Sequence, residues 1–94
     1  MITPTGRLVC PDGDETAIVL RHRDRHVELT RAEPGCRFFR VEPTSDPLVW
    51  TVYERFVDEA AFDSHQSRVR ASDWGRATAS IERDYVIESA AGSG

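Results

Sequence analysis

His65 is the side chain whose type and position best suit acid–base chemistry. It lies in the stretch AFDSHQSRV, with Phe62 three residues before it and Val69 four residues after it. This spacing places the three side chains on one helical face, so the imidazole is expected to point toward the interior. A histidine titrates near neutral pH and can serve as a base. The other interpretation is a structural histidine that donates an N–H to a backbone carbonyl.

Glu54 is a second candidate for the same site. The sequence predicts it on a strand, on the same side as Trp50, because strand side chains alternate between the two faces of a sheet. A carboxylate in an apolar row needs a partner. That partner is either an arginine, such as Arg37 or Arg40, or the site itself, where Glu54 would orient His65 or bind a substrate hydroxyl.

Aromatic residues are numerous enough to wall a pocket for a flat substrate. The candidates for substrate contact are Phe39, Trp50, Phe62, Trp74 and Tyr85. Each such residue is more often an ordinary core residue, and the sequence does not separate the two uses.

Two other groups of reactive side chains are expected to be structural. His22 and His26 are four residues apart in RHRDRH, but the surrounding arginines disfavour a metal ion, so a solvated helix face is expected, with His26 leaning toward the core beside Val19. Cys10 and Cys36 lie on strands predicted to be separated by a third strand, too far apart for a disulfide. No metal site is predicted.

The elements that position these residues follow the order β-α-β-β-α-β. Strands are predicted at residues 6–10, 36–42, 48–57 and 84–88, and helices from about 14 to 34, 59 to 69 and 73 to 80, the last two capped by Asp58 and Ser72. This order indicates a ferredoxin-like α+β sandwich, in which helices cover one face of an antiparallel sheet.

The sheet is expected to need a cover on its second face. Val49, Tyr53 and Val57 project opposite to Trp50, so both faces of this strand carry apolar residues, whereas a wet face should alternate with polar ones. With no sequence left to cover that face, a second copy of the chain is the simplest cover. The sequence therefore predicts a homodimer.

Composition limits the classes of function. The 94 residues carry a net charge of -4, which indicates one acidic domain over residues 1–89 with a flexible tail at 90–94 and argues against nucleic-acid binding. No signal-peptide pattern or membrane-spanning run is present, so a cytoplasmic location and no membrane partner are expected. All 12 basic residues are arginine, which excludes lysine Schiff-base chemistry.

One combination of motifs resembles a known family. The string TRAEPGCRFFRVE at residues 30–42, followed by P-x-x-W-x-x-x-E-x-F-x-D-x-x-A-F-x-x-H from residue 47, is similar to the antibiotic biosynthesis monooxygenase domain family, in particular to its quinol monooxygenase-like members. The resemblance covers about residues 30–67 and is carried by the combination rather than by E-P-G alone. It implies a dimeric α+β barrel, formed by two ferredoxin-like sheets, with a small-molecule pocket between each sheet and its helices.

The resemblance also implies a chemistry. Members of the family oxidise quinol-type aromatics with dioxygen and use no metal or organic cofactor, and the family histidine matches His65. The chain departs from several branches because it contains no asparagine, and it has no histidine after His65 to ligate haem iron, so haem degradation is disfavoured. The leading hypothesis is a cofactor-independent monooxygenase of quinols or related polyphenols. The alternatives are a non-catalytic dimeric module that binds small aromatic molecules and an isomerase on the same fold.

Overall fold

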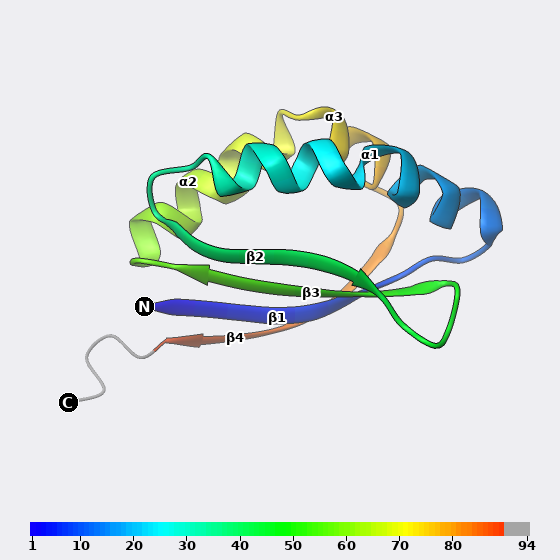
Figure 1. Ribbon diagram of the computed structural model, residues 1–94, viewed down its shortest axis with the longest axis horizontal. Coiled ribbons are helices and arrows are strands. Elements are labelled where there is room, and N and C mark those ends of the chain that lie inside the picture. Colours follow the sequence, from blue (N-terminus) through cyan, green and yellow to red (C-terminus); the bar gives the residue numbers. More distant parts are fainter. Residues whose placement is uncertain (90–94) are drawn as a thin grey trace.

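A four-stranded antiparallel sheet carries three helices on one face in the computed structural model, which describes residues 1–89 (Figure 1). The elements are β1 (Ile2–Val9), α1 (Gly13–Arg31), β2 (Cys36–Pro43), β3 (Val49–Phe56), α2 (Glu59–Arg70), α3 (Asp73–Ala77) and β4 (Glu82–Ser89). This confirms the predicted ferredoxin-like α+β fold. The tail predicted at 90–94 lies outside the described residues.

The strand order β2-β3-β1-β4 places β3 between β1 and β2, as predicted. Both neighbours run antiparallel to β3, so Cys36 at the start of β2 lies opposite Phe56, whereas Cys10, just after β1, donates its backbone N–H to the carbonyl of Leu48 at 2.8 Å. The two cysteines therefore lie near opposite ends of the sheet. Both are free thiols.

Side-chain caps fix the starts of the helices. Asp58 accepts a hydrogen bond from the backbone of Ala61 at 2.8 Å, and the Ser72 hydroxyl accepts one from Gly75 at 3.1 Å, so both predicted caps are confirmed. Asp12 caps α1 in the same way, through Glu15 at 3.0 Å. No helix within residues 1–89 combines the length and the apolar character needed to cross a membrane.

Strand β1 is longer than predicted because it begins at Ile2 rather than at residue 6. Pro4 lies within this extension, although proline cannot donate a ladder hydrogen bond. The pairing of β1 with β3 is interrupted at this proline: neither Thr3 nor Pro4 has a partner in the β1–β3 register, although both are paired with residues of β4.

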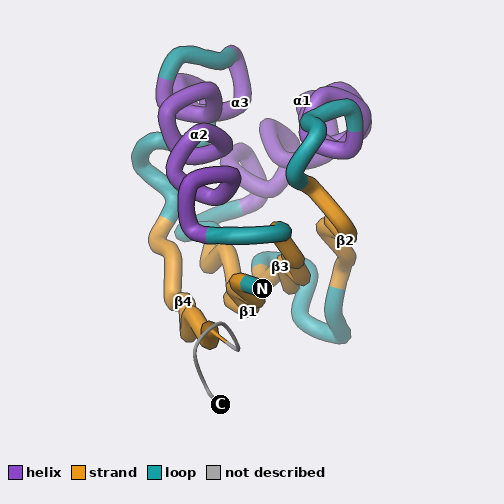
Figure 2. Tube along the Cα trace, turned by 90° about the vertical axis from the view of Figure 1, so that its left-hand side faces the viewer, coloured by secondary structure: helices purple, strands orange, loops and turns teal. Residues whose placement is uncertain are grey.

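The core fills the space between the sheet and the helices. Viewed along the sheet, α1 lies above the β2 side, and α2 with α3 lies above the β1 and β4 side (Figure 2). The buried hydrophobic residues that form this core include Leu8, Val19, Phe39, Val41, Trp50, Val52, Trp74 and Ile81.

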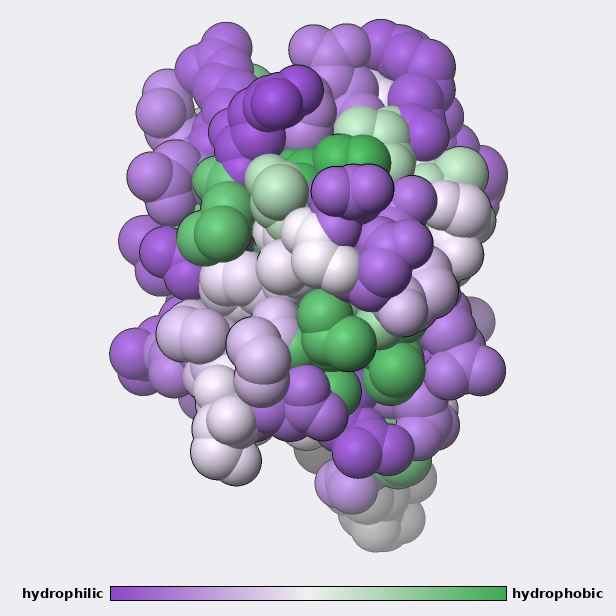
Figure 3. All heavy atoms as spheres, turned by 90° about the vertical axis from the view of Figure 1, so that its right-hand side faces the viewer, coloured by the Kyte–Doolittle hydropathy of each residue, from purple (hydrophilic) through white to green (hydrophobic). Residues whose placement is uncertain are grey.

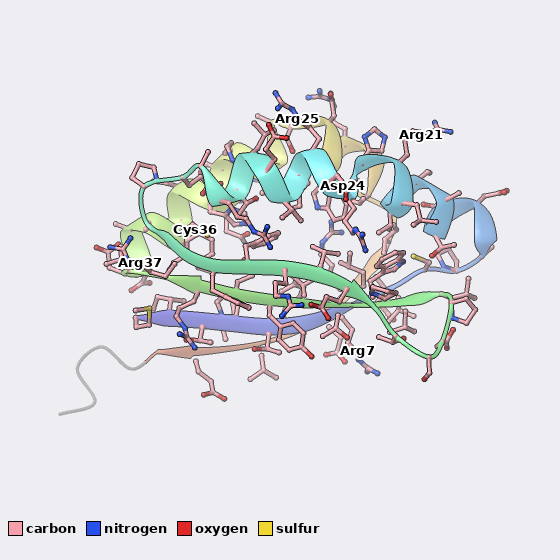
Figure 4. The ribbon with its side chains drawn as sticks, in the orientation of Figure 1. Arg7, Arg21, Asp24, Arg25, Cys36 and Arg37 are labelled. Carbon is pink, nitrogen blue, oxygen red and sulfur yellow. The ribbon has the colours of Figure 1, made fainter. Side chains whose placement is uncertain are left out.

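The outer face of the sheet is more polar than the sequence analysis expected. Its exposed apolar side chains are Phe38, Tyr53 and Val86, which are 42%, 41% and 64% exposed. Charged residues lie among them, and Arg7 projects on the side opposite the helices, where it pairs with Asp84 at 3.1 Å (Figure 4). At the end of the molecule that carries the β2–β3 loop, apolar surface is likewise divided into small patches (Figure 3).

Candidate active site

His65 points from α2 into the core, as its spacing with Phe62 and Val69 predicted. Its side chain is only 4% exposed. The Nδ1 atom lies 3.0 Å and 3.2 Å from the two carboxylate oxygens of Glu33, while Nε2 lies 3.5 Å from Oε1 of Glu54. A carboxylate can only accept hydrogen bonds, so this geometry favours a proton on Nδ1 and a lone pair on Nε2.

Glu33 is a site residue that the sequence analysis missed. It lies just after α1, and its carboxylate also accepts a hydrogen bond from Nε of Arg68 at 2.7 Å. Arg68 is itself held by the Thr30 hydroxyl, at 2.9 Å from Nη2. The dipeptide Glu33-Pro34 gave no signal of this role, because the contact joins positions 32 residues apart.

Glu54 projects from β3 into the same space and is 5% exposed. Its predicted pairing with Arg37 or Arg40 is wrong: Arg37 donates to the carbonyl of Pro34, and Arg40 pairs with Glu42. Burial raises the pKa of Glu54 to about 7, an effect that the Tyr85 hydroxyl opposes and the charge of Glu33 reinforces. Its Oε1 atom has no hydrogen-bond partner among residues 1–89, and at 3.5 Å the His65 ring is close but not aligned for a hydrogen bond.

His26 is buried beside the site rather than solvated with the rest of its helix face. The residue is 4% exposed, in agreement with the expectation that it points toward the core beside Val19. Its ring stacks on Trp74 with a centroid separation of 4.3 Å and an interplanar angle of 0°. Burial, assisted by the positive charges that His65, Arg68 and Arg83 can carry, lowers the pKa of His26 to about 3. The ring is therefore neutral at physiological pH. No cluster of three or more candidate metal ligands occurs within residues 1–89.

Electrostatics keep His65 in the form required of a base. Burial lowers its pKa, the contact with Glu33 acts in the opposite direction, and the charge of Arg68 lowers it again. Burial and Arg68 thus favour the neutral imidazole, which can accept a proton. Glu33 stabilises the imidazolium that forms when His65 accepts one.

A cavity of about 40 Å³ lies beside His65, between the helices and the sheet. Among the predicted residues, Phe39, Glu54, His65, Trp74 and Tyr85 line it. By this measure a water molecule requires roughly 10–15 Å³, and an engineered apolar cavity that binds benzene has about 150 Å³. The cavity therefore holds a few water-sized molecules, and an aromatic ring enters only if side chains move.

A wider groove of about 320 Å³ lies outside this cavity, between α1 and the α2–α3 turn. The groove and the cavity share His26 and Trp74 as lining residues. The stacked pair thus forms the partition between a surface groove and the space beside His65.

Two predicted pocket residues lie away from this cavity. Trp50 donates its indole N–H to the Thr16 hydroxyl at 2.9 Å, and the Arg23 guanidinium lies 5.3 Å from the centre of its ring. Phe62 packs on Phe56 with a centroid distance of 5.6 Å. Neither Trp50 nor Phe62 lines the cavity beside His65.

Tyr85 reaches the cavity because of a glycine. Gly6 lies opposite Tyr85 in the β1–β4 register, and a Cβ at position 6 would come within 2.5 Å of the Tyr85 ring. The missing side chain leaves room for the ring over the strand. Burial, followed by the charge of Glu54, raises the pKa of Tyr85, so its hydroxyl stays protonated.

Comparisons with known proteins agree with this architecture. One solved antibiotic biosynthesis monooxygenase is 24% identical over 96% of this chain and 98% of its own, with a TM-score of 0.76. A protein of the same description from Nitrosomonas europaea is 16% identical over 97% and 99%, with a TM-score of 0.75, and one from Deinococcus radiodurans is 19% identical over 96% and 92%, also at 0.75. These similarities concern the fold.

The sequence itself was also compared with curated proteins and with models of protein families. No curated protein matches it. The model of the antibiotic biosynthesis monooxygenase family matches residues 1–77, which include α1, β3, α2 and the side chains of Glu33, Glu54 and His65. The chain belongs to the antibiotic biosynthesis monooxygenase family.

Proposed function

We propose that the protein is a monooxygenase that oxidises quinols or related small phenols with dioxygen, without a metal or organic cofactor. The observation that carries the proposal is the arrangement of His65, whose Nδ1 contacts Glu33 at 3.0 Å while Nε2 lies 3.5 Å from Oε1 of Glu54, a residue that lines the cavity together with His65. A base held in this way takes a proton from a phenol bound on the cavity side.

His65 starts the reaction by removing the phenolic proton. The resulting phenolate is rich in electrons and transfers them to dioxygen. For a simple quinol the balanced reaction is quinol plus dioxygen to hydroxyquinone plus water: one oxygen atom enters the ring, the other leaves as water, and the quinol supplies all four electrons. The protonated His65 can return its proton to the departing oxygen.

The neighbouring groups suit a phenolic substrate. In the described part of the chain nothing hydrogen-bonds Oε1 of Glu54, and burial raises the pKa of this carboxyl to about 7, so it can exchange a hydrogen bond with a second hydroxyl in either protonation state. Phe39 and Trp74 provide flat apolar walls. Because the closed cavity has only about 40 Å³, we propose that the substrate ring enters from the outer groove as His26 and Trp74 separate.

We also propose that the protein is a homodimer formed through the outer face of the sheet. Tyr53 and Val86 both lie opposite Thr5, on the strands on either side of β1, and form an exposed apolar row across the middle of this face. The Arg7–Asp84 and Arg40–Glu42 pairs beside this row provide charges for a complementary contact.

Oxygen consumption tests the proposed activity. The purified protein would be supplied with hydroquinones, catechols and naphthoquinols in an oxygen electrode, with catalase and superoxide dismutase added to suppress autoxidation. We expect His65→Ala to lower kcat/KM by roughly 10²- to 10⁴-fold, the usual contribution of a general base. Asp63→Asn, an exposed change on the same helix, should match wild type. Uptake by wild type equal to that of buffer, or of His65→Ala, would contradict the proposal.

A further inference from the structure

We propose that Glu33 is a positioning residue for His65: it fixes the Nδ1–H tautomer, directs the Nε2 lone pair into the cavity, and stabilises the imidazolium that forms when the base takes a proton. The catalytic part of this inference rests on the proposed function. The tautomer and the protonation equilibrium of His65 do not, and they can be measured without a substrate.

The contact geometry supports this role. Both oxygens of Glu33 lie within 3.2 Å of Nδ1, so a small rotation of the carboxylate preserves the contact. Glu33 is held from the other side by Nε of Arg68 at 2.7 Å, and Arg68 is anchored by Thr30, which is fully buried. The carboxylate is therefore fixed by a guanidinium that itself has little freedom.

The charges around His65 leave Glu33 as its stabilising partner. From α2, the positive charge of Arg68 opposes protonation of the His65 ring. From α1, His26 is neutral and contributes no negative charge that would favour it. From β3, Glu54 approaches Nε2, but its carboxyl is raised to a pKa of about 7 and is only partly ionised near neutrality. From β4, Tyr85 keeps its proton and Arg83 is cationic. Glu33 is thus the carboxylate in direct contact with the ring that favours the imidazolium.

Glu33 is also reachable from outside the core. Its side chain is 16% exposed, and it borders a surface groove of about 530 Å³ whose walls include Pro34, Val57 and Ala61. Arg68 borders the same groove. If the Glu33 side chain were removed, the Arg68 guanidinium would face a space large enough for a small carboxylate. Formate should therefore enter and take over the contact with Nδ1.

Nitrogen-15 NMR of the imidazole gives the first test. We expect neutral His65 to be mainly the Nδ1–H tautomer in wild type, and to shift toward the Nε2–H tautomer in Glu33→Ala, together with a further fall in its pKa. Glu33→Gln serves as a second variant that keeps the side-chain volume, and it should lower the pKa as well because the negative charge is gone. An unchanged tautomer and pKa in folded Glu33→Ala would overturn the proposal.

Chemical rescue tests the catalytic consequence. Glu33→Ala should lower kcat/KM by about 10²-fold, Glu33→Asp should retain part of the activity, and added formate should restore Glu33→Ala by at least tenfold. Formate should not help His65→Ala, and Asp63→Asn should behave as wild type. A loss of activity in Glu33→Ala that formate fails to restore would contradict the positioning role. If wild type turned over no quinol, the proposed function would fail while the NMR result still decided the role of Glu33.

Discussion

At the scale of single residues, burial raises the pKa of one side chain in the site and lowers the pKa of another. Glu54 resists losing its proton, with a pKa of about 7, and His26 resists gaining one, with a pKa of about 3. Both groups line the cavity beside His65. Burial in this cavity therefore favours the uncharged form of both groups, and this preference should appear in the pH dependence of the protein's stability.

The raised pKa of Glu54 makes the folded state less stable at higher pH. Between its ordinary value of 4.5 and about 7, Glu54 is protonated when folded and ionised when unfolded, so stability is lost as pH rises through this window. The shift corresponds to a loss on the order of 3 kcal/mol. We expect Glu54→Gln, which cannot ionise, to gain in unfolding free energy relative to wild type between pH 5 and pH 8, measured by urea denaturation.

A matched control for this prediction is Glu82→Gln on the solvent-exposed part of β4. Its unfolding free energy should follow that of wild type across the same pH range. A constant difference between Glu54→Gln and wild type at every pH would show that Glu54 ionises as easily in the folded protein as in the unfolded chain, against the prediction.

The lowered pKa of His26 has the opposite consequence. Below its ordinary value of 6.5 the unfolded chain binds a proton at His26 and the folded protein does not, so stability is lost as pH falls from 6.5 toward about 3. The full loss is on the order of 5 kcal/mol. We expect His26→Phe, which keeps a flat ring against Trp74, to become progressively more stable than wild type as urea denaturation is repeated at pH 7, 5 and 4.

His22→Phe is the control on the same helix, one turn earlier and only half-buried. It should leave the acid dependence of wild type in place. If His26→Phe and wild type lost stability in parallel below pH 6.5, His26 would not be the source of the acid sensitivity.

Sequence reasoning at this scale succeeded where a side chain's direction follows from its own element. The helical spacing of Phe62, His65 and Val69 correctly turned the imidazole inward, and strand alternation correctly buried Glu54. It failed where a contact crosses elements. The pairing of Glu33 with His65 depends on how the turn after α1 approaches α2. The two residues are 32 positions apart in the chain, so no local sequence pattern predicts their contact.

At the scale of elements, the position of α3 depends on the absence of a side chain at Gly75. A Cβ there would collide with the backbone carbonyl oxygen of Val69, at the end of α2. Helix α3 also carries Trp74, a wall of the cavity, so the close approach of the two helices places a site residue. We expect Gly75→Ala to lower the unfolding free energy by about 1–3 kcal/mol, as overpacking does, and to weaken substrate binding.

Gly13→Ala provides the matched control, because a Cβ at the start of α1 would meet nothing within 4 Å. Alanine is the better helix former by up to about 1 kcal/mol, so this variant should be as stable as wild type or more so. Chemical denaturation of the two variants side by side decides the prediction. An equal, small effect of both substitutions would show that the α2–α3 contact tolerates a methyl group.

Element boundaries were predicted best where caps and turns mark them. Asp58 and Ser72 located the starts of α2 and α3, whereas the start of β1 was predicted at residue 6 rather than at Ile2, where no cap or turn residue marks the boundary. The end of α3 was placed too late, at residue 80 rather than Ala77. There the Thr78 hydroxyl and backbone N–H both donate to the Trp74 carbonyl and close the helix, a local contact that the sequence pattern did not predict.

At the scale of the whole molecule, the open face of the sheet bears on the proposed homodimer. We expect wild type to be dimeric and Tyr53→Glu to be monomeric, because the substitution places a charge in the apolar row formed with Val86. Leu20→Glu is the control: Leu20 is 59% exposed on α1, which packs on the other side of the sheet. Sedimentation equilibrium measures both. A monomeric wild type, or a dimer that Tyr53→Glu leaves intact, would contradict the proposed interface.

Labelling with ¹⁸O₂ shows whether the protein inserts oxygen into its substrate. Wild type should place one labelled oxygen atom in the oxidised quinol and the other in water for each turnover, and His65→Ala should lose this incorporation in proportion to its loss of activity. A product that carries no label while dioxygen is consumed would show that the protein only oxidises the quinol and inserts no oxygen. That result would contradict the monooxygenase function.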